Sequence, residues 1–512
     1  MAHRGRSVQR TGASLEGTLY NYNARIIDAR IAEREKARAS DRLLDLYTNT
    51  AIGNGVIEAG ITDVIGTGLT PIPNPIQSIT NLSAKKHEKY VQTVTENWEV
   101  FTRDPRNFCD VMRRNSFIRL QQYAEFAWRL TGIGVFQLIR RKEKFKAYDL
   151  EILAIDSCRL LTPSDKYSDN NIYDGIEIDD YGKPVAVWIA RPTSMIYHGS
   201  VPSAQCQRLP VWNEKTGLRD ILLVCDTRNI SEYRQDGILT PMLKEIRDSG
   251  DAIDAVIVKF LISNQLALFI QDQSSAIPNP DTDWQERITM LDSGMILHGG
   301  AGEVPINLES SSQPGQQYEL LMRSILERLG MVTGKGYEDL TRQYQSSFSA
   351  AKANIGKAGI KNNMERLSIV ETFCDSVMQA FQLELAVKGI TKVSNINHFL
   401  DNLYAYTRTS WLPQGEHILD EYKKANANKL SLESGQLSYS TVYGKENTDW
   451  KQAFRQVAIE IKEVQKLEKE FSVTLPFYKN ISQSVGTQQG GFESSNMKNN
   501  EMDKEDAETE KE

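Results

Sequence analysis

The sequence predicts an α+β protein in which a region of short strands lies between long helical stretches. Apolar residues recur at helical spacing over most of the chain, whereas between Gly132 and Ile230 the period is that of strands. Runs such as VFQLIR, LEILAI, GIEIDD, PVAVWIA and ILLVCD are separated there by glycine, proline and aspartate turns, and YGKP marks a hairpin. With 512 residues, of which 40% are hydrophobic, the chain exceeds the size that one core usually serves. More than one structural region is therefore expected.

Several helical stretches are predicted before the strands. Residues 24–47 place apolar side chains at helical spacing among alternating charges, which is typical of an amphipathic helix with one face in solvent. The next helix ends at Gly66 or Gly68 and leads into an extended segment punctuated by proline. Further helices are expected over residues 83–101 and 108–130.

After the strands, a helix that begins at Leu239 carries a narrow apolar seam. Its positions step by three and four, a spacing that suits packing side by side against neighbouring helices. The seam consists of Leu239, Leu243, Ile246, Gly250, Ile253, Ile257 and Phe260. Three acids, Glu245, Asp248 and Asp251, lie off this seam.

The rest of the chain alternates breaks and helices. SSAIPNPD ends the seam helix, and GMILHGGAGEVPINLE is typical of a strand, a glycine turn and a second strand. Helix resumes near Gln316, and after a glycine-rich interval a long helix runs from about Phe348 to Lys388. Three helical blocks follow Trp411. After about Gln483 the sequence is acidic with almost no large apolar residues, which predicts a disordered tail.

Charge and cysteine usage narrow the possible classes of function. The net charge is -7 and the isoelectric point is near 5.7, so the chain lacks the basic balance of a protein that grips nucleic acid tightly. Any contact with DNA must be local or loose. The five cysteines are scattered without a CxxC pair, which indicates reduced thiols in a cytoplasmic protein. No long apolar run predicts export or a membrane span.

No constellation of catalytic residues is recognisable. The segment GMVTGKG, residues 330–336, has three residues where a phosphate loop needs four, and a glycine where the magnesium ligand belongs. The six histidines are too widely spaced for a local metal motif, and no serine sits in a GxSxG elbow. The acid pairs Asp179–Asp180 and Glu96–Glu99 fit a turn and a solvated helix face. We expect no enzymatic activity, no metal and no cofactor.

Several segments resemble the lambda-type portal protein family of tailed phages. The most specific is LERLGMVTGKGYEDLTRQYQSSFSAAKANI, and the resemblance extends from about Arg38 to Glu470. Positions in register with the family are Gly330, Tyr337, Glu338, Leu340, Ser346, Ser347 and Ala351, and later Trp411, Pro413, Gly435, Ser440, Gly444 and Asp449. Lys352 departs from the arginine that the family usually carries.

The resemblance implies a portal fold with a mixed wing, a helical stem, a small clip that contains β-structure, and an α-helical crown. The implied regions are N-terminal segment and wing 1–238, first stem helix 239–266, clip 267–315, second stem helix 316–332, tunnel loop 333–347, long wing helix and wing return 348–410, crown 411–475 and disordered acidic tail 476–512. A narrow seam on a helix with few local partners suits packing against copies of itself in a ring.

The implied function is that of a portal protein, which forms a ring at one capsid vertex and serves as the DNA channel for genome packaging and ejection. The implied partners are eleven further copies in a dodecamer, double-stranded DNA, the terminase large subunit, capsid and scaffold proteins, and the head-tail connector, with no membrane. The protein would act in the virion and, during assembly, in the host cytoplasm. The alternative is another phage head-completion or adaptor ring protein, although such proteins are usually much shorter.

Three groups of site residues follow from this reading. Lys335, Tyr337, Arg342 and Tyr344 would contact DNA from the tunnel loop, unless the loop merely connects two helices and its charges pair with Glu338 and Asp339. Acids on the first stem helix would line the channel, or else only solvate an outer face: Glu245, Asp248 and Asp251. Seam residues would face neighbouring subunits: Leu243, Ile246, Ile253, Ile257 and Phe260.

Overall fold

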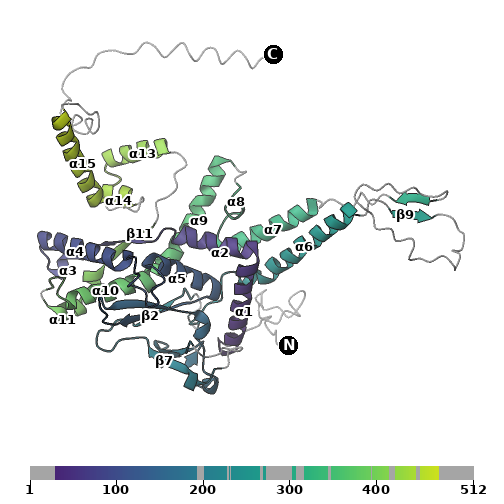
Figure 1. The fold of residues 1–512 in the computed structure, drawn as a ribbon, viewed down its shortest axis with the longest axis horizontal. Helices are drawn as coiled ribbons and strands as arrows, with labels where there is room; N and C mark the ends of the chain where they lie inside the picture. Colours follow the sequence, from purple (N-terminus) through teal and green to yellow (C-terminus); the bar gives the residue numbers. More distant parts are fainter. Residues whose placement is uncertain are drawn as a thin grey trace, which may run out of the picture. The chain divides into compact units, whose positions relative to one another are not determined.

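The computed structural model forms two compact units, the first up to residue 417 and the second in the helices after residue 418 (Figure 1). It describes residues 29–192, 201–227, 230, 232–265, 269–272, 303–306, 316–343, 347–393, 395–413, 421–444 and 450–471. The predicted tail after residue 476 lies outside these residues. No described helix combines the length and apolar character needed to cross a membrane.

The first unit begins with helices that confirm most of the prediction. They are α1 (Ala29–Asn49), α2 (Ala51–Val64), α3 (Gln77–Thr80), α4 (Ala84–Arg103) and α5 (Phe117–Thr131). The predicted start of α5 at residue 108 is wrong. The carboxylate of Asp110 accepts hydrogen bonds from the backbone N–H groups of Met112, Arg114 and Asn115, which holds residues 110–115 in a turn. The helix starts only where Ser116 caps it.

The predicted strands form two antiparallel sheets. One has the order β3-β2-β8, with β2 (Gly134–Arg140), β3 (Leu150–Ile155) and β8 (Ile221–Val224). The other has the order β4-β5-β6-β7, with β4 (Ile172–Tyr173), β5 (Ile176–Ile178), β6 (Pro184–Ala190) and β7 (Cys206–Pro210). The YGKP hairpin joins β5 to β6, with Gly182 at a φ of 82°.

A separate β-ribbon follows the seam helix, α6 (Leu243–Gln265). Its strands β9 (Phe269–Asp272) and β10 (Glu303–Ile306) pair antiparallel. Residues 303–306 were predicted as the second strand of a glycine-turn hairpin. They pair with β9, the strand directly after α6, and the predicted first strand lies outside the described residues. A one-dimensional pattern identifies a strand but not its distant partner.

Four further helices and one strand among the described residues also belong to the first unit. They are α7 (Gln316–Thr333), α8 (Tyr337–Thr341), α11 (Ile396–Asp401), α12 (Leu403–Thr407) and β11 (Thr409–Leu412). The strand β11 pairs with β1 (Thr70–Pro73), so the extended proline segment after α2 is held by residues more than three hundred positions later in the chain.

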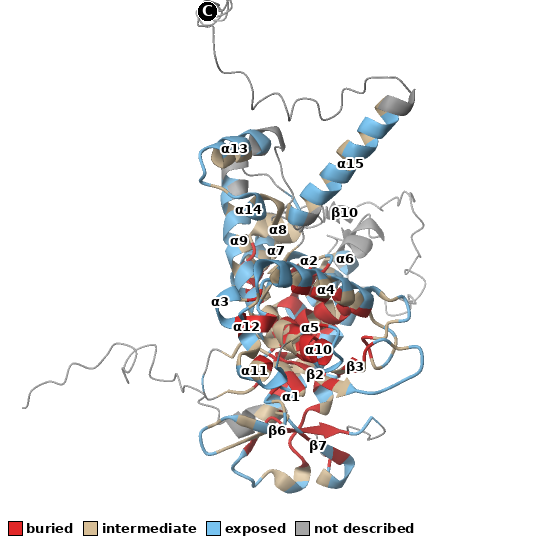
Figure 2. Ribbon diagram, turned by 90° about the vertical axis from the view of Figure 1, so that its left-hand side faces the viewer, coloured by how far each residue is buried: buried red, intermediate tan, exposed pale blue. Residues whose placement is uncertain are grey.

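The predicted long helix is confirmed, with an interruption. It consists of α9 (Phe348–Ile369), a π-helical turn (Val370–Cys374) and α10 (Asp375–Val387). Buried residues gather in α10, α5 and β2, whereas much of α9 is exposed (Figure 2). The π turn therefore lies where the helix passes from the surface into the core.

Aromatic rings fill the core around α10. Trp98 of α4 lies edge-on to Phe117 of α5 at 5.0 Å between ring centroids and to Phe381 of α10 at 5.2 Å. Trp411 of β11 also packs on Trp98 and donates its indole N–H to Asp375 Oδ1 at 2.7 Å. These contacts close the first unit around one helix from late in the chain.

Three helices lie in the described residues of the second unit, which confirms the three helical blocks predicted after Trp411. They are α13 (Glu421–Glu433), α14 (Tyr439–Gly444) and α15 (Trp450–Phe471). The ring of Phe454 on α15 is surrounded by Tyr439, Tyr443 and Trp450 at centroid distances of 5.1 to 5.9 Å. These aromatic contacts connect α14 and α15 within the unit, although Tyr439 and Phe454 remain partly exposed.

A buried ionic cluster joins α2, α5 and α9 in the first unit. Arg129 of α5 is 2% exposed and donates to the carboxylates of Glu125, one turn earlier, and Glu365 of α9. Lys361 pairs with the same Glu365 at 3.2 Å. Gly60 of α2 leaves room for the guanidinium, because any Cβ there would collide with it. Burial raises the pKa of Glu125 to about 7.

The raised pKa of Glu125 predicts a pH-dependent stability. A carboxyl group with a raised pKa in the folded state contributes fully to stability below its ordinary value of 4.5, and this contribution is lost as the pH rises through about 7. Between about pH 5 and pH 8, the wild type should therefore lose up to about 3 kcal/mol of stability relative to Glu125→Gln. Thermal melts across this range measure the difference. Glu99→Gln, on the exposed face of α4, is the control, and a pH-independent difference for Glu125→Gln would contradict the assignment.

Candidate functional site

The helices α6 and α7 form a pair that extends from the body of the first unit toward β9 and β10 (Figure 1). At the body end, Ile246 of α6 packs with Ile325 and Leu329 of α7 in a cluster that also contains residues of α1 and α2. Arg328 Nη1 on α7 lies 3.2 Å from Glu245 Oε1 on α6. The near end of the pair is thus fixed by apolar packing and an ion pair.

The predicted seam divides into two parts. Ile246 is 1% exposed and Leu243 is half-buried against the same cluster, so their partners lie within the subunit. Farther along, Ile253 is half-buried and Ile257 is 50% exposed. The side chain of Phe260 lies outside the described residues. The prediction that Ile246 faces a neighbour is thus not supported, because its own subunit already covers it.

More apolar side chains are exposed on the helix pair than the seam contained. Val258 on α6 is 53% exposed, and Leu320 and Leu321 on α7 are 64% and 50% exposed. None of these three residues belongs to the predicted seam. The outer half of the pair therefore presents apolar surface on both helices.

The three predicted channel acids differ in environment. Asp248 and Asp251 are exposed, and Asp251 lies 3.8 Å from Arg247 one turn earlier. Glu245 is half-buried and held by Arg328. Only the first two present carboxylates that are open to solvent, and whether they face a channel stays a prediction.

The predicted tunnel loop contains a tight turn and a short helix. After α7 ends at Thr333, Gly334 adopts a φ of 73°, and the backbone N–H of Lys335 donates to Gly330 O at 3.0 Å. Gly336 caps α8, and Asp339 Oδ2 accepts from the Gly336 backbone N–H at 3.3 Å. The segment is therefore structured through Thr341.

The predicted DNA-contacting residues lie in different settings. The side chain of Lys335 is 3% exposed, and its Nζ lies 2.5 Å from Asp63 Oδ2 of α2. Tyr337 is half-buried with the Arg323 guanidinium 5.4 Å from its ring centre. Arg342 is exposed and adopts a left-handed φ of 55°. Tyr344 lies outside the described residues.

The partner of Lys335 was missed in the sequence, which suggested Glu338 or Asp339 instead. Asp63 lies 272 positions earlier, at the end of α2, and nothing in the local pattern connects the two residues. The buried cluster of Glu125, Arg129 and Glu365 was also missed: Glu125 and Arg129 are one turn apart on α5, but Glu365 lies 236 positions after Arg129. Among the described residues, no group of histidine, cysteine or carboxylate side chains is arranged to hold a metal ion.

Comparison with known proteins places the chain in a family. A family model for phage portal proteins of the lambda family matches residues 19–361. Portal protein B of Escherichia phage lambda is 18% identical over 474 residues, which cover 87% of each chain. The portal protein of Escherichia phage N15 is 19% identical and covers 82% of this chain and 83% of its own. A probable portal protein of Halomonas phage phiHAP-1 is 20% identical over 71% of this chain and 69% of its own.

Solved structures show weaker likenesses. A chain from the virion of a native gene transfer agent particle aligns with a TM-score of 0.37 and 10% identity, over 81% of this chain and 93% of that one. A chain from the neck of such a particle aligns with a TM-score of 0.39 and 10% identity, over 80% and 96%. Neither score establishes a common fold. The family model, by contrast, covers well over half of the sequence, and this chain belongs to the lambda family of phage portal proteins.

Proposed function

We propose that this portal protein assembles into a closed ring at one vertex of the capsid of a tailed phage, through which the genome is packaged and later ejected. The observation that carries the proposal is the family match over residues 19–361, supported by curated portal proteins that align over most of their own length. Twelve subunits are the number that the family resemblance implies. The ring would be a structural component without enzymatic activity.

The exposed apolar side chains of α6 and α7 supply the subunit contacts in this proposal. Ile257, Val258, Leu320 and Leu321 are each at least half exposed. Removing apolar surface from water contributes about 25 cal/mol per Å², so a neighbouring copy that covers both helices would stabilise the ring. A closed ring repeats the same contact at every subunit boundary and leaves no such surface open.

Charge on the inner surface would let DNA pass. Asp248 and Asp251 are exposed on α6, and repeated around a ring they would form a band of negative charge that repels phosphates. Arg342, exposed after α8, would give sparse phosphate contacts without sequence preference. Lys335 would instead anchor the tunnel loop to α2, because its ammonium already pairs with Asp63.

The remaining partners follow from the same proposal. The clip, residues 267–315, would dock the terminase large subunit during packaging and the head-tail connector afterwards, and of this segment the structure describes β9 and β10. Capsid and scaffold proteins would meet the ring during assembly in the host cytoplasm, and the finished ring would remain in the virion.

Ring assembly is tested by placing charges on the outer half of α6. The double variant Ile253→Asp with Ile257→Asp should fail to form rings, because a neighbouring copy would bury carboxylates without partners. Electron microscopy and mass photometry of the purified protein measure assembly. Ile253→Leu with Ile257→Leu is the matched control, and circular dichroism checks that each subunit folds. Normal rings from the aspartate variant would refute the contact surface.

The roles of Arg342 and Lys335 in the tunnel loop are tested by substituting each residue separately. Arg342→Ala should form rings but retain several-fold less packaged DNA, whereas Arg342→Lys should keep most of the wild-type amount, since it preserves the charge. Lys335→Met should lower the melting temperature through loss of the Asp63 ion pair. Genome content per particle is the measurement. Full DNA retention by Arg342→Ala would leave the loop as a connector.

A further inference from the structure

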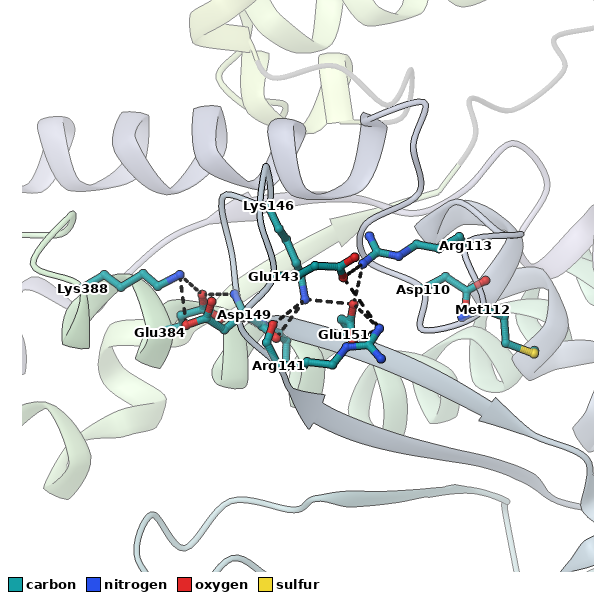
Figure 3. A network of polar contacts seen from close by, with 11 residues as sticks. Asp110, Met112, Arg113, Arg141, Glu143, Lys146, Asp149, Glu151, Glu384 and Lys388 are labelled. Atoms are coloured by element: carbon teal, nitrogen blue, oxygen red, sulfur yellow. Dashed lines mark hydrogen bonds and ion pairs between the residues drawn. The ribbon is translucent and has the colours of Figure 1, made fainter. Parts of the chain in front are cut away.

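Two loops on the first unit form a continuous surface that the proposed function does not use. They are residues 104–116, between α4 and α5, and residues 141–149, between β2 and β3. Arg113 Nη2 lies 2.5 Å from Glu143 Oε2, and Arg106 Nη1 donates to Phe145 O at 3.5 Å. Figure 3 shows Arg113, Arg141, Glu143 and Lys146 converging between the loops. We call this pair of loops the 104–149 surface.

A buried carboxylate holds the two loops of the 104–149 surface in place. Glu151 of β3 is fully buried and lies 3.0 Å from Arg113 Nη2, 3.2 Å from Arg141 Nη2 and 3.0 Å from Lys146 Nζ. Asp110, also fully buried, holds the other loop through its backbone bonds. Three cations thus gather around Glu151, and two of them, Arg113 and Arg141, also lie near Glu143. Both loops are held in place before any partner binds.

Above this base the surface presents apolar side chains together with cations. Phe145 is 87% exposed and Met112 is 46% exposed. The ring of Phe108 lies between two guanidinium groups, 4.4 Å from Arg106 and 4.2 Å from Arg113. Three further cations are exposed and form no ion pair within the described part of the chain: Arg114, Lys142 and Lys144. A basic, partly apolar patch thus stands out on a protein with a net charge of -7.

The backbone of the 104–149 surface is strained. Asn107, Arg113 and Phe145 have φ values of 51°, 60° and 64°. They account for half of the six non-glycine residues with positive φ in the described part of the chain. Each such residue costs on the order of 1–2 kcal/mol. Phe145 adopts this strained conformation although its ring is largely exposed to solvent. Strain of this kind persists at sites where a binding conformation is held ready.

We propose that the 104–149 surface docks an acidic segment of another polypeptide, in which aspartate or glutamate residues flank a large apolar side chain. The apolar side chain would cover Phe145 and Met112, while the carboxylates would pair with Lys142, Lys144 and Arg114. Arginine, methionine and aromatic residues are enriched in protein interfaces. Asp104 and Glu143 interrupt the cations, so the partner needs negative charges at irregular spacing, which a polypeptide offers and the evenly spaced phosphates of a nucleic acid do not.

The test uses a short synthetic peptide with a Phe-Leu pair between runs of Asp and Glu, labelled for fluorescence anisotropy, and the purified full-length protein. Wild type should bind it, and raised salt should weaken binding. Phe145→Ser, and separately Lys142→Glu with Lys144→Glu, should each weaken binding about tenfold or more. The matched controls are Tyr181→Ser, at a 97% exposed hairpin tip, and Lys85→Glu with Lys86→Glu on α4. These controls should bind like wild type.

Three outcomes would overturn the proposal. The first is equal peptide binding by the Phe145 and lysine variants and their controls. The second is tighter binding of single-stranded DNA than of the peptide with the same sensitivity to Phe145→Ser, which would make the surface a nucleic-acid site. The third is loss of assembly in Phe145→Ser, which would make the occupant a second copy of this chain. Because all substituted side chains are exposed, unchanged melting temperatures confirm that each variant is folded.

Discussion

The arrangement of the first unit depends on one buried guanidinium. Arg129 lies between the carboxylates of Glu125 and Glu365 and so joins α5 to α9, while Gly60 lets α2 approach from the third side. Removing one member of such a buried group costs about 3–5 kcal/mol, because the charges that remain lose their partner. Apolar packing could hold three helices together at several rotations. The ionic cluster adds charged contacts between α5 and α9, and α2, which packs beside it at Gly60, also carries Asp63, the partner of Lys335 in the tunnel loop.

Much of the fold could be predicted from local pattern, because helix and strand periods depend on neighbouring residues. The strands β2, β3, β5, β6 and β8 and the helices α4, α6 and α10 lie close to where the sequence put them. The prediction failed where a side chain redirected the backbone or a distant segment intervened. Asp110 delays the start of α5, and β10 pairs with β9 across residues that no short pattern connects.

The candidate site was less predictable, because exposure depends on tertiary structure. The seam on α6 has one uniform spacing, yet Ile246 is buried within the subunit and Ile257 is 50% exposed. Periodicity marks an apolar face without saying which partner covers it. Lys335 and Arg342 look alike as cations of one loop, but within the described residues Lys335 is buried against Asp63 of another helix, whereas Arg342 is exposed. Sequence alone could not separate an anchoring cation from an open one.

The position of α10 also has a consequence for how the chain is made. The helix fills the core between α4, α5 and the β3-β2-β8 sheet, and β11 then seals β1. A ribosome must therefore synthesise about four-fifths of the polypeptide before the first unit can close. Until then α4, α5 and the sheet expose the apolar surface that α10 will cover, and their contacts span long stretches of sequence. Nascent subunits would pass through an open, aggregation-prone stage, so folding chaperones of the host have a defined period in which to act.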